Sequence, residues 1–437
     1  MNSEWPVVLV EDVCELIVDC VNKTAPVVSY ETPFRMVRTT NIREGRVSLD
    51  SCRFVDEATY EKWTRRAKLQ YGDVLLTREA PIGEVGFVDM PEGLFLGQRI
   101  MQYRANPKVL HPRFLHYAFQ SPSLKHQFGS HEGSGSVVSH IRVGDCFKFK
   151  IPLPPIDVQD GVAGLLGALD DRITLLRETN ATLEAIAQAL FKTWFVDFDP
   201  VRAKAEGRQP EGMDAATAAL FPDSFEESEL GLVPKGWLLS ALGDAFEVNP
   251  TRKLKKGDFA PYLDMASVGT QGHVVDGVIG REMGSGTKFI NDDTLLARIT
   301  PCLENGKTAY VDFLDAGQVG WGSTEFVVLR PKAPLPPYYG YLLARHPAFR
   351  DHAIQSMSGT SGRQRIQNDV LGRYPVAIPP PEVAEAFAGI VQSAQQRIAA
   401  NQEQAQTLTQ LRDTLLPRLI SGQLRLPGTE ALLEEAL

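Results

Sequence analysis

The sequence predicts an α+β protein in which two similar globular domains are separated by two long helices that pair as an antiparallel coiled coil. Three observations predict this class: an internal repeat over nearly the whole chain, short β-rich runs broken by glycine and proline, and two long heptad patterns. The repeat is clearest where residues 73–78 (DVLLTR) return as residues 293–298 (DTLLAR). Trp5 likewise returns as Trp237, so the halves form a pseudo-twofold internal repeat.

The length leaves room for this organisation, because 437 residues correspond to two to four domains at roughly 100 to 200 residues each. The predicted segments are a first globular domain at 1–155, a first spacer helix at 156–199, a connector at 200–236, a second globular domain at 237–379, a second spacer helix at 380–425 and a tail at 426–437. Pro200, Pro210, Pro222 and Pro234 punctuate the polar connector, which we expect to be irregular.

Within each globular domain, strand-like runs alternate with turn residues and short helical stretches. Residues 74–76, 85–88 and 326–329 are rich in β-branched and large apolar side chains, and residues 113–120 have the pattern of a helix. This mixture predicts an α+β domain.

Each spacer helix carries apolar residues at the alternating spacings of four and three that define a coiled-coil seam. The seam residues of the two helices are Val162, Leu166, Leu169, Ile173, Leu176, Asn180, Leu183, Ala187, Leu190, Trp194, Phe387, Val391, Ala394, Ile398, Asn401, Ala405, Leu408, Arg412, Leu415 and Leu419. The antiparallel register that pairs Trp194 with Phe387 places Asn180 opposite Asn401. Two facing amides can satisfy each other and fix the register. Arg412 falls opposite Leu169, which requires its guanidinium to extend into solvent.

Composition indicates a folded protein of the cytoplasm. Hydrophobic residues make up 43% and charged residues 23%, which excludes a disordered tail. No apolar run approaches the roughly 20 residues that span a bilayer, and the first ten residues lack the cationic start of an export signal. Five scattered cysteines without a Cys-x-x-Cys pair fit a reducing compartment. We therefore expect a soluble, cytoplasmic protein with no membrane partner.

The net charge of −9 is, taken alone, unfavourable for binding nucleic acid. The acidic excess, however, lies in residues 156–236 and 380–437, whereas both globular domains are close to neutral. The overall charge therefore does not exclude DNA as a partner of the globular domains.

Two short motifs resemble catalytic loops but lack essential residues. Residues 306–308 (GKT) resemble the end of a phosphate-binding loop, yet Pro301 stands where that loop needs glycine, and the following residues favour a strand. Residues 335–338 (LPPY) resemble the loop that holds a flipped base in amino-methyltransferases, but leucine replaces the side-chain acceptor. A proline-initiated helix is the better interpretation of that segment.

No metal site or catalytic group is predicted. Residues 222–223 (PD) lack the acidic-x-Lys triplet of a metal nuclease, and the histidines between His111 and His140 have no Cys or carboxylate at metal-ligand spacing. No nucleophile has a recognisable base and orienting group. We expect a non-catalytic chain that holds no metal and no cofactor.

Each globular domain carries polar and cationic side chains in glycine-rich segments. Arginine and lysine suit phosphates and guanine edges, while asparagine and glutamine suit adenine. The candidate DNA-binding residues are Arg35, Arg38, Asn41, Arg43, Arg78, Ser134, Ser136, Ser139, His140, Arg142, Arg298, Thr360, Ser361, Arg363, Gln364 and Arg365. Arg78 and Arg298 are equivalent in the repeat, so a contact with phosphate, common to both halves, suits them better than base recognition. An ordinary solvated surface is the alternative for any one of these residues.

The central part of the chain resembles a known family. Residues 161–170 and 183–204 (LEAIAQALFKTWFVDFDPVRAK) closely resemble the central conserved region of type I restriction-modification specificity (S) subunits. Residues 212–225, 233–237 (VPKGW) and 72–78 (GDVLLTR) are similar to the same family. The resemblance covers the whole chain, and its central run is long and specific.

The resemblance implies a function. In this family two target-recognition domains each read one half of a split, asymmetric DNA sequence, and the helices form a spacer that docks two methyltransferase subunits. The implied cofactors belong to partners: S-adenosylmethionine to the adenine methyltransferase, and ATP with magnesium to a motor-nuclease subunit where one exists. The alternatives are a coiled-coil scaffold that never binds DNA, which salt-dependent DNA affinity would distinguish, and a fused methyltransferase or nuclease.

Overall fold

The computed structural model describes residues 4–130, 140–228, 231–275, 277–360 and 362–426. The chain divides into two compact units. Unit 1 comprises residues 1–174 and 405–437, and unit 2 comprises residues 175–404. Within the described ranges, no helix combines the length and apolar character needed to cross a membrane.

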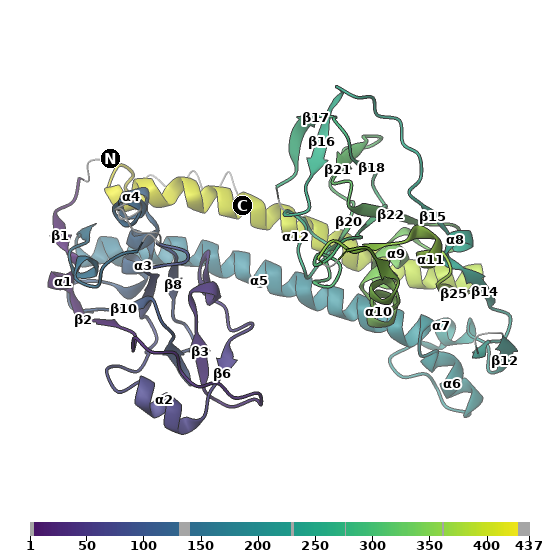
Figure 1. The fold of residues 1–437 in the computed structure, drawn as a ribbon, viewed down its shortest axis with the longest axis horizontal. Coiled ribbons are helices and arrows are strands. Elements are labelled where there is room, and N and C mark those ends of the chain that lie inside the picture. Colours follow the sequence, from purple (N-terminus) through teal and green to yellow (C-terminus); the bar gives the residue numbers. More distant parts are fainter. Residues whose placement is uncertain (1–3, 131–139, 229–230, 276, 361, 427–437) are drawn as a thin grey trace. The chain divides into compact units, whose positions relative to one another are not determined.

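Unit 1 contains two sheets and a short strand pair (Figure 1). The first sheet has the order β2 (Cys14–Asp19), β10 (Ile100–Ala105), β7 (Val74–Thr77), β8 (Val85–Phe87), β5 (Gly45–Val47) and β4 (Ile42–Arg43). The second sheet has the order β6 (Arg53–Phe54), β3 (Arg35–Val37) and β9 (Leu94–Leu96), and β1 (Val7–Leu9) pairs with β11 (Lys150–Pro152). The runs predicted as strands at 74–76 and 85–88 are β7 and β8.

Helices pack against both sheets of unit 1. The helices are α1 (Val10–Val13), α2 (Glu57–Trp63), α3 (Pro112–Gln120) and α4 (Pro122–Gly129), with 3-10 turns η1 (Thr39–Asn41) and η2 (Asp145–Phe147). Proline opens both α3 and α4 in the first turn, where its missing N–H costs no hydrogen bond. Phe114, Leu115 and Phe119 of α3 are fully buried, and α3 contacts β7, β8 and β10.

Unit 2 repeats this plan. Its first sheet has the order β15 (Phe246–Val248), β22 (Phe326–Pro331), β19 (Thr294–Ala297) and β20 (Thr308–Tyr310). Its second sheet has the order β17 (Ile279–Glu282), β16 (Phe259–Leu263), β21 (Gly320–Gly322) and β18 (Thr287–Phe289). Shorter pairs are β14 (Leu238–Ala241) with β25 (Pro375–Ile378), and β23 (Met357–Ser358) with β24 (Arg365–Ile366).

The helices of unit 2 also follow unit 1. They are α8 (Leu242–Ala245), α9 (Pro337–Arg345), α10 (Pro347–Gln355) and α11 (Asn368–Leu371). Helix α9 contacts β19, β20 and β22, as α3 does in unit 1. The proline-initiated helix predicted at 335–338 is α9, and the strand predicted after residues 306–308 is β20. Figure 1 shows the second sheet of unit 2 projecting away from α12 (Pro381–Ser421).

The connector at 200–236 is not irregular, so that prediction is wrong. It contains α6 (Asp199–Ala205), α7 (Ala215–Ala219) and the hairpin β12 (Phe225–Ser228) and β13 (Gly231–Pro234). Val201 and Phe221 are buried, and Phe221 packs edge-on against Trp194 at 4.9 Å between ring centroids. These elements are too short to give a periodic signal, although their apolar side chains belong to the core of unit 2.

One buried ion pair marks the repeat inside both units. Asp73, at the start of β7, is fully buried and accepts hydrogen bonds from Nε and Nη2 of Arg104, both at 2.8 Å. Asp293, at the start of β19, is fully buried and accepts from Nη1 of Arg330 at 2.7 Å. A buried carboxylate requires such compensation, so each pair ties a strand end to the neighbouring strand in its own sheet.

Two long helices run through the sequence of both units: α5 (Ile156–Phe195) and α12 (Pro381–Ser421). In unit 2, Trp194 of α5 packs against Phe387 of α12 at 5.7 Å. Asn180 lies two heptads before Trp194 on α5, and Asn401 lies two heptads after Phe387 on α12. The two asparagines are hydrogen-bonded, so the two helices are antiparallel there. The fold class predicted from the sequence is confirmed.

The expectation for Arg412 is wrong. Its side chain is 20% exposed and does not extend into solvent. Nη1 donates to Oδ1 of Asp170 at 2.7 Å, and Nε and Nη2 donate to Asp413. A carboxylate one position after Leu169 thus neutralises the cation within unit 1, so the seam contains a partly buried ion pair.

Candidate nucleic-acid interface

A hairpin in unit 2 carries most of the candidate residues of the second half. Met357 pairs with Ile366 and Ser358 with Arg365 in the antiparallel pair β23–β24. Gly359 starts the tip with φ +132°, a conformation that side-chain-bearing residues rarely adopt. Thr360 and Arg363 are exposed at this tip, and Gln364 is half-buried.

Arg298 anchors that hairpin to the end of β19. Its backbone carbonyl accepts from the N–H of Ile366 at 2.9 Å, and its Nη2 donates to the carbonyl of Ile366 at 2.8 Å. Thr300 adds a second reciprocal contact, because its N–H donates to the Gln364 carbonyl and its Oγ1 accepts from the Gln364 N–H, both at 3.1 Å. The hairpin is therefore fixed by four hydrogen bonds to one short segment.

Unit 1 contains the same anchor. The carbonyl of Arg78 accepts from the N–H of Ile141, and Nη1 of Arg78 donates to the carbonyl of Ile141, both at 3.0 Å. Both arginines are half-buried, and each has a buried Nε without a hydrogen-bond partner among the described residues. The geometry gives Arg78 and Arg298 a loop-anchoring role, while contact with phosphate stays a prediction.

Arg365 is held by a carboxylate from a distant part of unit 2. Its Nε donates to Oε2 and Oε1 of Glu325 at 2.9 and 3.1 Å, and its Nη2 donates to Oε1 at 2.6 Å. The hydrogen bond from Arg365 lowers the pKa of Glu325 below its usual value, so the carboxylate stays ionised at neutral pH. Glu325 thus fixes one edge of the guanidinium.

The early candidates of unit 1 lie around β3 to β5. The guanidinium of Arg35 lies over the ring of Phe54 at 5.4 Å, and Nη2 of Arg38 donates to the Ser51 carbonyl at 2.7 Å. Arg43 is exposed, and its Nη1 lies 3.6 Å from Oε1 of Glu84.

Asn41 occupies a different environment. It is 1% exposed, its Oδ1 accepts from the N–H of Arg38 at 3.0 Å, and its Nδ2 donates to the carbonyl of Asp50 at 2.8 Å. In this conformation the Asn41 amide braces the loop and has no edge facing solvent.

The remaining candidates are placed only in part. Ser134, Ser136, Ser139 and Ser361 lie outside the described residues. His140 is half-buried, directly before the anchored Ile141, and Arg142 is exposed directly after it. The structure thus brings together Arg78, His140 and Arg142 in unit 1, and Arg298, Gln364 and Arg365 in unit 2.

The sequence interpretation missed Glu325. The structure shows where Glu325 stands in the repeat: Glu325 directly precedes β22 as Arg99 directly precedes β10, and each carbonyl accepts from the N–H of the anchoring arginine. Arg99 pairs with Glu79 at 2.9 Å, so the two halves carry opposite charges at one equivalent position.

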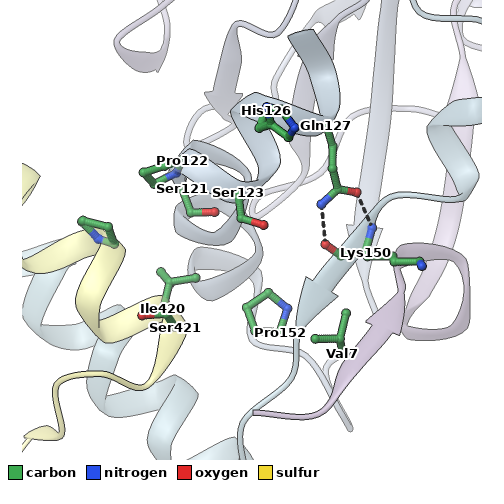
Figure 2. A pocket seen from close by; sticks show the side chains of 11 residues that line it. Val7, Ser121, Pro122, Ser123, His126, Gln127, Lys150, Pro152, Ile420 and Ser421 are labelled. Atoms are coloured by element: carbon green, nitrogen blue, oxygen red, sulfur yellow. Dashed lines mark hydrogen bonds between the residues drawn. The ribbon is translucent and has the colours of Figure 1, made fainter. Parts of the chain in front are cut away.

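A groove in unit 1 lies between α4, the β1–β11 pair and the last turn of α12 (Figure 2). Its volume is about 440 Å³, and Val7, Pro152 and Ile420 contribute much of its apolar lining. The Gln127 amide donates to the Lys150 carbonyl at 2.9 Å and accepts from the Lys150 N–H at 2.8 Å, so these groups of the lining satisfy each other. In the described part of the chain, no three His, Cys, Asp or Glu side chains could hold a metal ion.

The seam residues lie between the paired helices. Within the seam set, the buried side chains are those of Val162, Leu166, Leu169, Ile173, Leu176, Ala187, Trp194, Phe387, Val391, Ile398, Asn401, Ala405, Leu408, Leu415 and Leu419, and Asn180, Leu183, Leu190, Ala394 and Arg412 are half-buried. Nδ2 of Asn401 donates to Oδ1 of Asn180 at 2.8 Å, and Nδ2 of Asn180 donates to the Ile398 carbonyl at 3.2 Å. The seam amides therefore satisfy each other and the backbone.

Comparison with known proteins assigns the family. A family model described as the type I restriction modification DNA specificity domain matches residues 2–185 and again residues 234–417. The specificity subunit of the type I restriction enzyme MjaIX from Methanocaldococcus jannaschii is 27% identical, over 81% of this chain and 78% of that protein. The HindI specificity subunit from Haemophilus influenzae is 24% identical, over 82% and 87%.

A solved structure agrees with this assignment at the level of the fold. The S subunit of a type I restriction-modification system from M. genitalium superposes with a TM-score of 0.57 at 15% identity, over 96% of each chain. Two matches to one family model cover most of the sequence, each on one half of the repeat. The chain therefore belongs to the type I restriction-modification DNA specificity family.

Proposed function

We propose that this chain reads a split, asymmetric DNA sequence, with one half-site recognised by each globular domain. Specificity subunits of this family are recognition subunits and are not catalytic. The observation that carries the proposal is that two copies of one scaffold anchor a loop in the same way, through Arg78 and Arg298, while the side chains around the anchors differ. A shared scaffold with different loops is what an asymmetric two-part target requires.

The charges near the anchored loops support a DNA ligand. Arg142 in unit 1 and Arg363 in unit 2 are exposed beside the anchors, and the overall acidity is concentrated in the helices and the connector. Exposed arginines on otherwise near-neutral domains supply phosphate contacts without making the whole chain cationic. We therefore assign the DNA-facing surface to these loops.

We further propose that α5 and α12 dock two adenine methyltransferase subunits and, where one exists, a motor-nuclease subunit. Exposed apolar side chains on the helices of unit 2 support a protein partner: Ile186 is 53% exposed and Ile390 is 46% exposed. The partners would bring the cofactors, namely S-adenosylmethionine for methylation, and ATP with magnesium for the motor nuclease.

Methylation mapping tests the function directly. The chain is co-expressed with its neighbouring adenine methyltransferase in a host without such modification, and N6-methyladenine is mapped across the genome. We expect one split motif that appears only when this chain is present. Methylation that is absent, or independent of this chain despite a stable complex, would favour a coiled-coil scaffold without a DNA-reading role.

Domain exchange then tests the division of labour. Replacing residues 1–155 by the corresponding domain of another specificity subunit is expected to change one half-site and preserve the other. The reciprocal exchange of residues 237–379 serves as the matched control and should alter the other half-site. A change in both half-sites after either exchange would contradict the assignment of one half-site to each domain.

A further inference from the structure

We propose that Arg365 reads a guanine in the half-site recognised by unit 2, and that Glu325 is the positioning residue that aims it. The inference rests on the proposed function and assigns a base contact within it. It starts from a geometric fact: the carboxylate that holds Arg365 comes from outside the hairpin, at the start of β22, and binds only one edge of the guanidinium.

The hydrogen bonds to Glu325 leave a defined set of donors. An arginine side chain has five N–H donors in a planar fork. Nε and one N–H of Nη2 are directed to Glu325. The second N–H of Nη2 and the two of Nη1 form the end of the fork, and this end is suited to two parallel acceptors. The side chain of Arg365 is 44% exposed, so a ligand can reach that end.

The hairpin gives the fork a rigid base. Arg365 itself is a β24 residue paired with Ser358, and Oγ of Ser358 accepts from Nε2 of Gln367 at 2.7 Å. Arg298 fixes the next residue, Ile366, by two hydrogen bonds. Arginine loses rotamer entropy when it binds, and a side chain that is already held at both its backbone and one guanidinium edge loses less of it.

The chemistry of the free end favours guanine over phosphate. In the major groove, guanine presents O6 and N7 as adjacent acceptors that match the arginine fork. A phosphate would bring a second anion beside Glu325, whose Oε1 lies 2.6 Å from Nη2 of Arg365, and like charges in such proximity repel. Guanine carries no net charge, so it can share Arg365 with the carboxylate.

Unit 1 supplies an internal control. Arg99 occupies the position equivalent to Glu325 and pairs with Glu79 rather than with the anchored loop. The proposed pairing of Glu325 with Arg365 is therefore confined to one half of the chain, and its loss should affect one half-site only.

The test uses the full chain in complex with its methyltransferase. N6-methyladenine motifs are mapped for the wild type, Arg365→Ala, Glu325→Ala and Glu325→Gln, with Arg363→Ala as the control on the same hairpin. We expect one G·C pair in the half-site of unit 2 to become degenerate in the Arg365 and Glu325 variants, with the other half-site unchanged. Arg363→Ala should retain the guanine preference.

A chemical probe tests the same contact without relying on the variants' activity. Replacing that guanine by 7-deazaguanine removes the N7 acceptor, and we expect it to weaken binding by the wild-type complex about tenfold but not binding by the Arg365→Ala complex. Hydrogen exchange across residues 357–367 verifies that the hairpin still forms in each variant, and Arg365→Lys, which keeps the charge but lacks the fork, replaces any variant in which it does not.

Three results would overturn the inference: a guanine that stays invariant in the Arg365 variants, an equal effect of 7-deazaguanine on wild type and variant, or a uniform loss of affinity for all sequences, which indicates a phosphate contact. A wild-type complex that methylates no split motif would instead overturn the proposed function. The two failures are therefore distinguishable.

Discussion

The two units attach their globular part to their own stretch of helix by different chemistry. In unit 1 the attachment combines an exposed ion pair with a phenol–carboxylate contact to Asp170, whose side chain is 20% exposed. Arg113 of α3 donates two hydrogen bonds to Asp171 of α5, at 3.2 and 3.3 Å, and the Asp171 side chain is 66% exposed. Tyr117 donates to Oδ2 of Asp170 at 2.7 Å, and Nη2 of Arg46 donates to the Asp170 carbonyl at 3.1 Å.

In unit 2 the attachment is buried. Tyr341 of α9 donates to Oε1 of Glu184 on α5 at 2.5 Å, and Glu184 is only 8% exposed. Burial, and then the negative charge of Glu184, raise the pKa of Tyr341 well above its usual value, so the phenol remains a proton donor. Beside it, Nε2 of Gln395 on α12 donates to Oδ2 of Asp312 at 2.8 Å.

The repeat places different residues at equivalent attachment points: His116 and Gln120 of α3 correspond to Tyr341 and Arg345 of α9. Both units thus use a phenol–carboxylate contact, but unit 1 adds an exposed ion pair and its acceptor Asp170 is half-buried, whereas the acceptor Glu184 of unit 2 is buried. Exposed pairs weaken with salt, whereas buried contacts are screened much less. One fold can therefore give two units whose stabilities respond differently to salt and pH.

The largest effect is expected from a substitution in the aromatic core where α5 packs against the globular part of unit 2. Phe191 of α5 is 1% exposed and packs against Tyr339 of α9 at 5.0 Å between ring centroids. Phe191→Ala leaves a cavity where helix and globular part meet, so we expect a loss of about 3 to 5 kcal/mol in the free energy of unfolding. Hydrogen exchange followed by mass spectrometry along a urea series measures this loss separately for each unit.

Ile186→Ala is the matched control for that variant, because Ile186 lies on the same helix but is 53% exposed. Its effect on the isolated chain should stay within about 0.5 kcal/mol. If Phe191→Ala lowers protection equally in both units, the two attachments are not independent and the comparison fails.

The next effect is a pH dependence specific to unit 1. Burial lowers the pKa of His116 to about 4, and Nε2 of this ring lies 2.8 Å from Nε2 of Gln120, so the neutral ring accepts there. In the unfolded chain the pKa is about 6.5. The contribution of the neutral His116 ring to the free energy of unfolding is therefore complete above pH 6.5. About 3 kcal/mol of it is lost as the pH falls from 6.5 to 4.

His116→Gln removes that titration while keeping an acceptor for Gln120. The free energy of unfolding of unit 1 is measured by hydrogen exchange along a urea series at several pH values between 4 and 7. It should depend less steeply on pH in the variant than in the wild type. Asp170, Arg113, Arg412 and Arg46 also act on His116, so the wild-type slope alone is not diagnostic. An unchanged slope in His116→Gln would assign the pH dependence to other groups.

The sequence predicted the architecture because its signals are periodic. The repeat and the heptads located the two halves, α5, α12 and the facing Asn180 and Asn401, and the family model confirms the repeat. The domain boundaries remain predictions. Contacts between single side chains from distant segments have no periodicity, and for this reason Glu325 was missed and the partner of Arg412 was not foreseen. The connector was misjudged because its helices and hairpin are short.

An intermediate effect is expected from the buried contact of unit 2. Glu184→Ala leaves the Tyr341 hydroxyl buried without its acceptor, and it removes the carboxylate 3.9 Å from Nε of Arg345. We expect unit 2 to lose about 1 to 3 kcal/mol, with nearly the same loss at low and high salt. Adding Tyr341→Phe to Glu184→Ala should recover part of the loss. A loss that disappears at high salt would contradict the buried character of this attachment.

The smallest effect is expected from the exposed pair of unit 1, and it gives the sharpest contrast with Glu184. Asp171→Asn removes the charge that Arg113 faces, in a pair whose side chains are 30% and 66% exposed. Exposed ion pairs contribute about 0.2 to 1 kcal/mol, and the Debye length shortens to about 3 Å at 1 M salt. A double-mutant cycle of Arg113→Met and Asp171→Asn, measured at 0.05 and 1 M sodium chloride, should therefore give a coupling energy that is small at low salt and absent at high salt. A coupling energy that persists at 1 M salt would mean that this contact is shielded from solvent, and the two units would then be fastened by the same kind of interaction.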